Sequence, residues 1–261
     1  MAETIRTGEF EMRYIKCGEG KRPLVILPGL SLISVIGSED AIISAYDIFA
    51  KDFTVYLFDR VSSMPDDYSV EDAADDTAKA IGLLGIDKVA LMGVSMGGMI
   101  AQYIAIKHSV LVDKLVLCST CAKTGNYTRN LMKDFNELSK TKNGHALSER
   151  FSSLIYSEQT MKAYGDMLIG SGDGAADEDF RRFSVQTAAC FKFDVTRLLS
   201  RISCPVLVLG AKNDRIIPVG DLLYVADTLS CERYVYGPPY GHAVYDEAPD
   251  FKQRIYDFLK K

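Results

Sequence analysis

Short apolar runs recur along the chain, and each is followed by glycine, proline or a polar residue. They span residues 24–27, 54–58, 88–92, 114–118 and 205–209. Continuous apolar runs of this length suit strands that are buried on both faces. Helical patterns lie between several of the runs, so the sequence predicts an α/β fold in which helices flank a mostly parallel sheet.

Local patterns predict further elements around these runs. Ser69-x-x-Asp72 is a capping-box pattern at the start of a helix that runs to about residue 84. Residues 97–107 form a second helical pattern. Near the N-terminus, apolar side chains alternate with charged ones over residues 10–14, which predicts a half-buried antiparallel strand.

One interval breaks this alternation of strands and helices. Between residues 122 and 201 the pattern predicts helices only, over 126–140, 145–169 and 177–199. About 80 residues far exceed the length of one crossover connection. We therefore predict a helical lid inserted into a core made of residues 1–121 and 202–261. The alternative is a set of ordinary crossover helices that cover nothing.

Composition and charge narrow the class of partner. The chain has 48% hydrophobic and 25% charged residues, as globular proteins do, and its net charge of −5 argues against nucleic acid or an anionic membrane. Its first nine residues contain no apolar signal core, and no apolar run reaches the ~18 residues of a membrane span. We expect a cytoplasmic protein that acts on a small molecule. The sequence indicates no oligomeric state.

The six cysteines are dispersed, so no disulfide framework is expected in a chain of this size. Cys118-x-x-Cys121 has the spacing of a redox or zinc pair, but it lacks a second pair and a nearby histidine. We interpret both residues as small buried or half-buried thiols.

The segment Gly93-Val94-Ser95-Met96-Gly97 directly follows a predicted buried strand and begins a predicted helix. Such a strand–turn–helix is the setting of a nucleophile elbow, in which a strained backbone lifts the serine hydroxyl above the sheet edge. Side chains at positions 93 and 97 would clash with neighbouring backbone, which explains the glycines. Ser95 is therefore the predicted nucleophile.

A serine hydroxyl needs a base to take its proton, and the chain has three histidines. His108 ends the helix after the elbow and lies at the far end of the sheet. His145 begins a lid helix and is expected in solvent. His242 follows the last apolar segment and lies at the same sheet edge as Ser95. His242 is therefore the predicted base.

The base needs an acid that orients its ring. Asp214 follows the strand 205–209 at the same sheet edge, and serine–acid–histidine is the order of one architecture among the serine hydrolases. Asp59 also ends a strand there and is the better rival, whereas Asp194 precedes its strand. Asp246 and Glu247 also follow His242, but they are expected to begin the last helix, where acids favour the dipole.

Two backbone N–H groups are expected to hold the oxyanion. One is that of Met96 at the helix start. The other is that of Leu30, in the loop after the first buried strand, where Pro28 has no N–H to offer. Gly29, Ser31 and Val94 lie next to these groups and are expected to contact substrate. A plain strand-ending turn is the alternative interpretation of this loop.

Together these segments resemble the α/β-hydrolase fold family over nearly the full chain. The segments that carry the resemblance are Leu27-Pro28-Gly29-Leu30, Gly93-Val94-Ser95-Met96-Gly97-Gly98, Gly210-Ala211-Lys212-Asn213-Asp214-Arg215-Ile216-Ile217-Pro218, Gly241-His242 and Glu247-Ala248-Pro249 with the helix that follows. The resemblance implies an eight-stranded, mostly parallel sheet, a helical cap and a Ser95–His242–Asp214 triad. It implies no metal or organic cofactor. Many members carry His-Gly where this chain has Pro28-Gly29.

The predicted chemistry is acyl transfer to water through an acyl-enzyme. The substrate is harder to predict, because this fold serves many reactions. An apolar entrance around Leu30, Leu32, Ile33, Met96 and Met99 favours a small or medium carboxylic ester. Apolar lid residues either face this pocket or form the core of the lid itself; they are Phe151, Leu154, Ile155, Tyr156, Met161 and Met167.

Two other functions stay open. The same residues could break a thioester, a carbon–carbon bond or an N-terminal peptide bond. An aminopeptidase would need lid acids to bind the substrate ammonium. The acids available in the lid are expected on solvent-exposed helix faces; they are Glu149, Glu158, Asp166, Asp177, Glu178 and Asp179. A protein of another class would keep the triad but act as a ligand sensor that signals through its lid to a partner.

Overall fold

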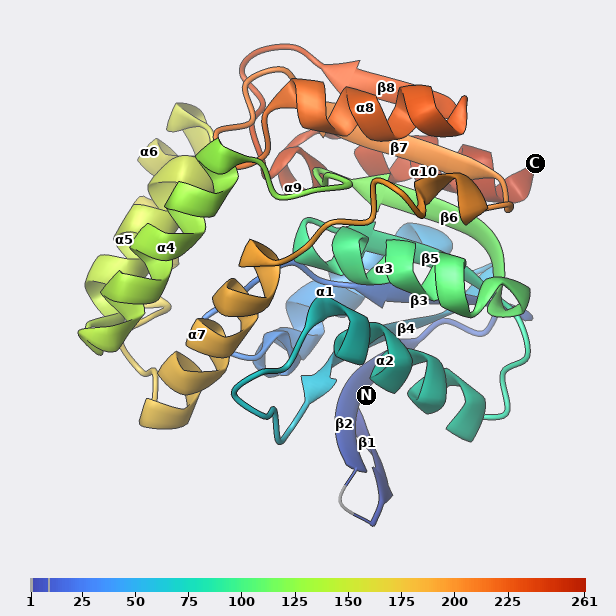
Figure 1. The fold of residues 1–261 in the computed structure, drawn as a ribbon, viewed down its shortest axis with the longest axis horizontal. Helices are drawn as coiled ribbons and strands as arrows, with labels where there is room; N and C mark the ends of the chain where they lie inside the picture. The colour runs from blue at the N-terminus through green and yellow to red at the C-terminus, as the bar shows by residue number, and fades with distance from the viewer. Residues whose placement is uncertain (1, 9) are drawn as a thin grey trace.

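The computed structural model describes residues 2–8 and 10–261, and an eight-stranded sheet with helices on both faces forms its centre (Figure 1). The strand order is β1-β2-β4-β3-β5-β6-β7-β8. The strands are β1 (Ala2–Thr7), β2 (Phe10–Cys17), β3 (Arg22–Leu27), β4 (Phe53–Val61), β5 (Val89–Val94), β6 (Val112–Cys118), β7 (Val206–Ala211) and β8 (Glu232–Tyr236). The pairs β1–β2 and β2–β4 are antiparallel, and all other neighbours are parallel. The predicted mostly parallel α/β fold is confirmed.

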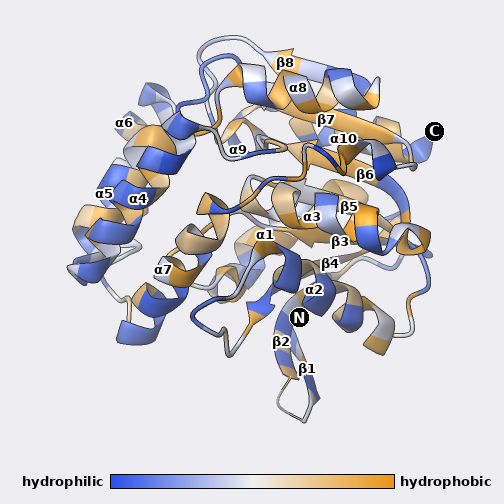
Figure 2. Cartoon of the chain, in the orientation of Figure 1, coloured by the Kyte–Doolittle hydropathy of each residue, from blue (hydrophilic) through white to orange (hydrophobic). Residues whose placement is uncertain are grey.

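Each apolar run of the sequence became a strand that is buried on both faces. In β3, for example, Leu24 and Ile26 belong to one hydrophobic core, whereas Val25 and Leu27 belong to the other. Successive side chains of a strand point to opposite faces, so one run supplies both cores. Figure 2 shows the strands of this parallel region coloured largely as hydrophobic.

Helices on the two faces complete these two cores. The helices α2 (Val70–Leu83), α3 (Met96–Lys107) and α8 (Val219–Leu229) cover one face, and α1 (Glu39–Tyr46), α9 (Val244–Glu247) and α10 (Phe251–Lys260) cover the other. Short 3-10 helices lie at Val35–Ser38 (η1), Asp47–Phe49 (η2), Ser109–Leu111 (η3) and Leu199–Arg201 (η4). No helix in the described part of the chain has the length and apolar character of a membrane span.

Four helices lie between β6 and β7, to the left of the sheet in Figure 1. They are α4 (Asn126–Lys140), α5 (Gly144–Ile155), α6 (Glu158–Gly170) and α7 (Asp177–Phe191). The helix α4 packs against α7, and α5 packs against α6. The two ends of this segment meet, because Thr124 N–H donates to the carbonyl of Phe193 (3.0 Å) and Val195 N–H donates to that of Ala122 (2.8 Å).

The structure corrects three details of the predicted elements. The predicted helix 145–169 is two helices, because the backbone is extended at Tyr156 and Ser157 and the Ser157 hydroxyl accepts from Thr160 N–H to begin α6. The predicted helix 177–199 ends at Phe191, since the residues that follow pair with the 122–124 segment. The strand β1 was not predicted, because Ile5 is its one buried side chain.

The predicted capping box of α2 is present and permits a stability test. The Ser69 hydroxyl accepts from Asp72 N–H (3.1 Å), and the Asp72 carboxylate accepts from Ser69 N–H (2.9 Å). We expect Ser69→Ala to lower the free energy of unfolding by about 1 kcal/mol, because an N–H at the helix start loses its partner. Urea denaturation measures this loss, and an unchanged midpoint would show that water replaces the cap.

Candidate active site

Ser95 lies on a strained turn between β5 and α3. Its backbone has φ +53° and ψ −118°, and residues other than glycine rarely adopt a positive φ. Ser95 N–H donates to the carbonyl of Cys118 on β6 (2.8 Å), and its own carbonyl accepts from the Thr120 hydroxyl (2.9 Å). These bonds hold the turn in its strained form, as a nucleophile elbow requires.

The glycines of the turn are needed for the close approach that the sequence predicted. A Cβ on Gly93 would lie 2.3 Å from the carbonyl oxygen of Gly97. A Cβ on Gly97 would lie 2.0 Å from the carbonyl oxygen of Leu27, at the end of β3. Both clashes are with backbone, which cannot move away cheaply.

His242 and Asp214 form a buried pair next to this turn. His242 Nδ1 lies 2.8 Å from Asp214 Oδ2, and each side chain is 3% exposed. The other oxygen of Asp214 accepts the N–H groups of Ile216 and Ile217, both at 2.8 Å. A carboxylate only accepts, so the proton of the imidazole lies on Nδ1 and the lone pair on Nε2.

The rival residues are occupied elsewhere in the structure. Asp59 accepts from the Ser34 hydroxyl, and Asp194 pairs with Lys123 (2.8 Å). His108 pairs with Asp75 at the end of α3 (2.8 Å). His145 contacts Asp173 on the exposed side of the helical segment (3.0 Å). The described residues therefore give His242 the predicted acid as its partner.

The loop after β3 lies against Ser95. A Cβ on Gly29 would lie 3.2 Å from Ser95 Cβ and 3.8 Å from Ser95 Oγ, so this loop borders the hydroxyl. The guanidinium of Arg60 is buried and donates from Nη2 to the carbonyl of Pro28 (2.6 Å). Arg60 thereby anchors the loop that contains Leu30, a role that the sequence did not indicate.

Ser95 and His242 line the same small cavity, of about 20 Å³. This is roughly the space of one water molecule. The predicted oxyanion residues Leu30 and Met96 line it too. As the first residue of α3, Met96 has an N–H without a partner in the preceding turn, and the positive end of the helix dipole lies there. The other lining side chains are almost all apolar; they are Met99, Thr128, Met132, Phe151, Ile155, Cys190, Ile216 and Ile217.

A larger cavity of about 640 Å³ adjoins the small one, because Leu30, Phe151 and Ile155 line both. Gly29, Ser31 and Val94, which the sequence predicted to contact substrate, lie on the wall of this larger cavity. The opposite wall belongs to α5 and α6. The larger cavity therefore lies between the helical segment and the 28–46 segment, next to the small cavity that Ser95 lines.

The helical segment supplies cavity residues that no motif could identify. Phe151, Ile155 and Tyr156 were predicted either to face the pocket or to form the core of the segment, and all three line a cavity. Met167 lines another cavity beside α6, described below. Cys118 and Cys121 are buried free thiols whose pKa values burial raises, as the interpretation of small buried side chains expected.

Proteins of known name are similar to this chain in sequence. The chain is 24% identical to "putative carbamate hydrolase RutD" of Rhizobium rhizogenes over 82% of this chain and 85% of that protein. The protein of the same name from Agrobacterium fabrum is 26% identical over 75% of this chain and 76% of its own length.

Solved structures superimpose over almost the full length. An alpha/beta hydrolase enzyme from a Medee basin deep-sea metagenome library has a TM-score of 0.88 and 23% identity, covering 99% of this chain and 98% of that one. The enol-lactonase from Burkholderia xenovorans has a TM-score of 0.86 and 18% identity, covering 99% and 100%. At such identities these likenesses concern the fold.

The sequence model of the alpha/beta hydrolase family matches residues 24–251, from the first buried strand to the last helix. The match includes the elbow, the Asp214–His242 pair and the loop beside Ser95. This chain belongs to the alpha/beta hydrolase family.

Proposed function

We propose that the protein hydrolyses a small or medium carboxylic ester, with Ser95 as nucleophile, His242 as base and Asp214 as the orienting acid. The observation that carries the proposal is the buried His242–Asp214 pair, whose facing atoms lie 2.8 Å apart, together with the small cavity that His242 and Ser95 both line. In this arrangement the Nε2 lone pair of His242 is available to take the Ser95 proton.

The reaction proceeds in two halves. Ser95 Oγ attacks the ester carbonyl while His242 takes its proton, and the Leu30 and Met96 N–H groups stabilise the oxyanion. His242 then gives the proton to the departing alkoxide, which leaves an acyl group on Ser95. Water then attacks the acyl carbon while His242 takes a proton from it, and His242 returns that proton to Ser95 Oγ as the bond to the acyl group breaks and the acid is released. Asp214 stabilises the imidazolium in both halves.

The residues that line the small cavity favour a substrate whose acyl or alcohol part is apolar. Met99, Met132, Phe151 and Ile155 surround the hydroxyl, and polar substituents there would lose hydration without a partner. Residues 122–201 act in this proposal as a cap over the core formed by residues 1–121 and 202–261. Carbamates and lactones, the compound classes in the names of two similar proteins, contain a carbonyl carbon as esters do, and a carbamate is the second substrate class to test.

Labelling with a fluorophosphonate tests the nucleophile before any substrate is chosen. We expect one adduct per folded wild-type chain by intact mass, located on Ser95 by peptide mapping. Ser95→Ala should take up none, and His242→Ala should react at least about 10³-fold more slowly because its serine lacks a base.

Two controls make this labelling informative. His145→Ala removes an exposed histidine (61%) and should label as the wild type does. Wild type unfolded in urea should not label. A folded wild type that takes up no probe would contradict the proposal and favour a ligand sensor that acts through its helical segment. Matched ester, thioester, carbamate and aminoacyl anilide substrates then identify the bond, and the ester should give the highest kcat/KM.

A further inference from the structure

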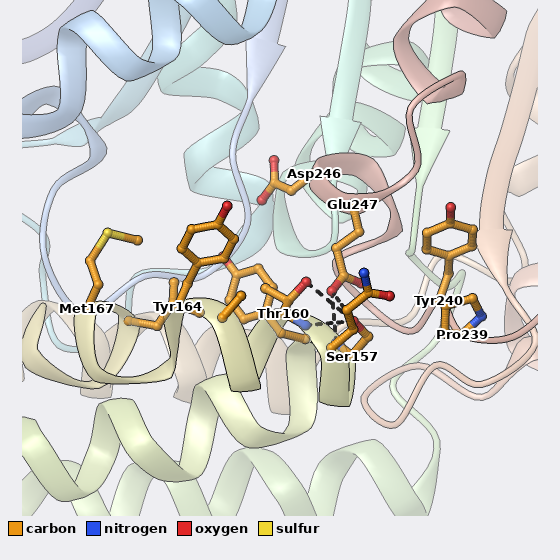
Figure 3. Close-up of a pocket in the computed structure, with 12 residues that line it drawn as sticks. Ser157, Thr160, Tyr164, Met167, Pro239, Tyr240, Asp246 and Glu247 are labelled. Carbon is orange, nitrogen blue, oxygen red and sulfur yellow. Dashed lines mark hydrogen bonds between the residues drawn. The ribbon is translucent and has the colours of Figure 1, made fainter.

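A third cavity, of about 570 Å³, lies between α6 and the segment around His242 (Figure 3). Its lining residues are Tyr156, Ser157, Gln159, Thr160, Ala163, Tyr164, Met167, Leu168, Pro239, Tyr240, Asp246 and Glu247. The charged members are both acidic, and neither lysine nor arginine is among them. The cavity therefore combines negative charge with aromatic and apolar walls.

Glu247 and Asp246 differ in the hydrogen bonds that their carboxylates accept from the protein. Glu247 Oε1 accepts from the N–H (2.9 Å) and the hydroxyl (2.7 Å) of Ser157. Glu247 Oε2 is buried and has no partner among the described residues. Asp246 makes no side-chain hydrogen bond or ion pair with any residue that the structure describes. Only Glu247 Oε2 is a buried oxygen without a partner. Asp246 is exposed, so its carboxylate is hydrated and is open to a cationic ligand.

The sequence-based expectation for these acids was wrong. Asp246 and Glu247 were expected to begin the last helix, but they end the short α9, and α10 begins only at Phe251. The charge of Asp246 is therefore not used at the start of α10. Figure 3 shows Asp246 and the hydroxyl of Tyr164 facing one another across the cavity.

Asp246 also lies where this cavity adjoins the larger one beside the Ser95 loop. Three residues, Tyr156, Leu168 and Asp246, line both this cavity and the larger one that contains Gly29 and Leu30. A ligand that occupies both cavities would extend past Asp246. The rings of Tyr156, Tyr164 and Tyr240 also line the cavity, and Tyr164 is 59% exposed.

We propose that this cavity is a subsite for an organic cation, a primary or quaternary ammonium group carried by the substrate, with Asp246 as its counter-charge and the tyrosine rings as its walls. Ring faces and a carboxylate together attract such a group. An anion would meet two carboxylates, and a divalent metal ion would need about six oxygen ligands where the walls offer mostly rings. As a statement about substrate, this inference rests on the proposed ester hydrolysis.

The charge state of Asp246 gives the subsite a pH dependence. The side chain of Asp246 is exposed to the cavity, but the surrounding protein still desolvates its carboxylate and raises its pKa to about 6; Lys252 opposes the shift and Glu247 adds to it. Burial and the nearby Asp246 carboxylate both raise the pKa values of Tyr46, Tyr156 and Tyr245, so these three hydroxyls stay neutral. The preference for a cationic ligand should therefore be full above pH 7 and fall as the pH drops through 6.

The kinetic test compares esters that differ only in charge. One pair has the same acyl group on choline and on 3,3-dimethylbutanol; a second pair places the trimethylammonium or tert-butyl group in the acyl chain. We expect wild type to prefer the cationic member of at least one pair by about tenfold in kcat/KM. Asp246→Asn should abolish the preference. Asp166→Asn, which removes an exposed charge from α6 outside the cavity, should keep it.

A binding test is independent of turnover. Isothermal titration calorimetry of benzyltrimethylammonium against folded Ser95→Ala should show one site, about tenfold weaker after a further Asp246→Asn change. Tyr164→Leu changes an exposed residue and should weaken binding several-fold. This variant replaces Asp246→Asn in the test if the latter does not fold.

The two tests separate the subsite from the proposed reaction. Binding without hydrolysis of any ester would overturn the proposed reaction and leave the subsite standing. Ester hydrolysis that shows no preference for the cationic member in either pair, and no binding of the cation, would overturn the subsite.

Discussion

Replacing Asp214 with asparagine is expected to lower kcat about 10⁴-fold, the size of loss that follows when the acid of a serine-hydrolase triad is exchanged in this way. Asparagine can keep the two hydrogen bonds from Ile216 and Ile217 through its one oxygen. Its NH2 group then faces His242 Nδ1, where the carboxylate oxygen was. Nδ1 becomes the acceptor, and the imidazole proton moves to Nε2. In that tautomer His242 cannot take the Ser95 proton.

Asp194→Asn is the matched control, because Asp194 was the weaker of two rival acids and forms an exposed pair with Lys123. It should keep kcat within about twofold, as surface ion pairs contribute little. Circular dichroism should show both variants folded. An Asp214→Asn variant that retains a tenth or more of the wild-type kcat would contradict the role of Asp214 and point to another group behind His242.

The sheet and the elbow were predictable because their signals are local. Residues 24–27 of β3 and residues 89–94 of β5 are all buried, and each is apolar or glycine. The apolar run in the sequence therefore predicts the buried strand directly. The elbow needs small residues at fixed positions, as the close approaches of Gly93 and Gly97 show. A search among three histidines for one at the same sheet edge then led to His242.

The sequence-based predictions that were wrong or missing concern features that depend on contacts between distant segments. β1 is a strand because it pairs with β2, although five of its six residues are exposed. The end of α7 follows from pairing between residues 193–195 and 122–124, which lie about 70 positions away along the chain. The position of Asp246 on two cavities depends on α6, which packs beside it. No pattern within one segment reports such a contact.

Gly97→Ala is expected to lower the free energy of unfolding by about 3 kcal/mol or more, at the upper end of the range for overpacked positions. The added methyl would lie 2.0 Å from the carbonyl oxygen of Leu27 and 2.6 Å from that of Pro28. Relief requires β3 and the loop behind it to move away from the elbow. That movement also displaces Gly29 and Leu30 from Ser95, so labelling of Ser95 should fall with stability.

Gly82→Ala is the control for this substitution, since the same methyl on the exposed face of α2 meets nothing within 4 Å. It should raise the free energy of unfolding by about 0.5–1 kcal/mol, because alanine restricts the unfolded chain and favours the helix. Urea denaturation of both variants gives the comparison. Equal stability of the Gly97→Ala variant and the wild type would mean that β3 and the elbow are not in the contact described, and the predicted geometry of the oxyanion loop would fail with it.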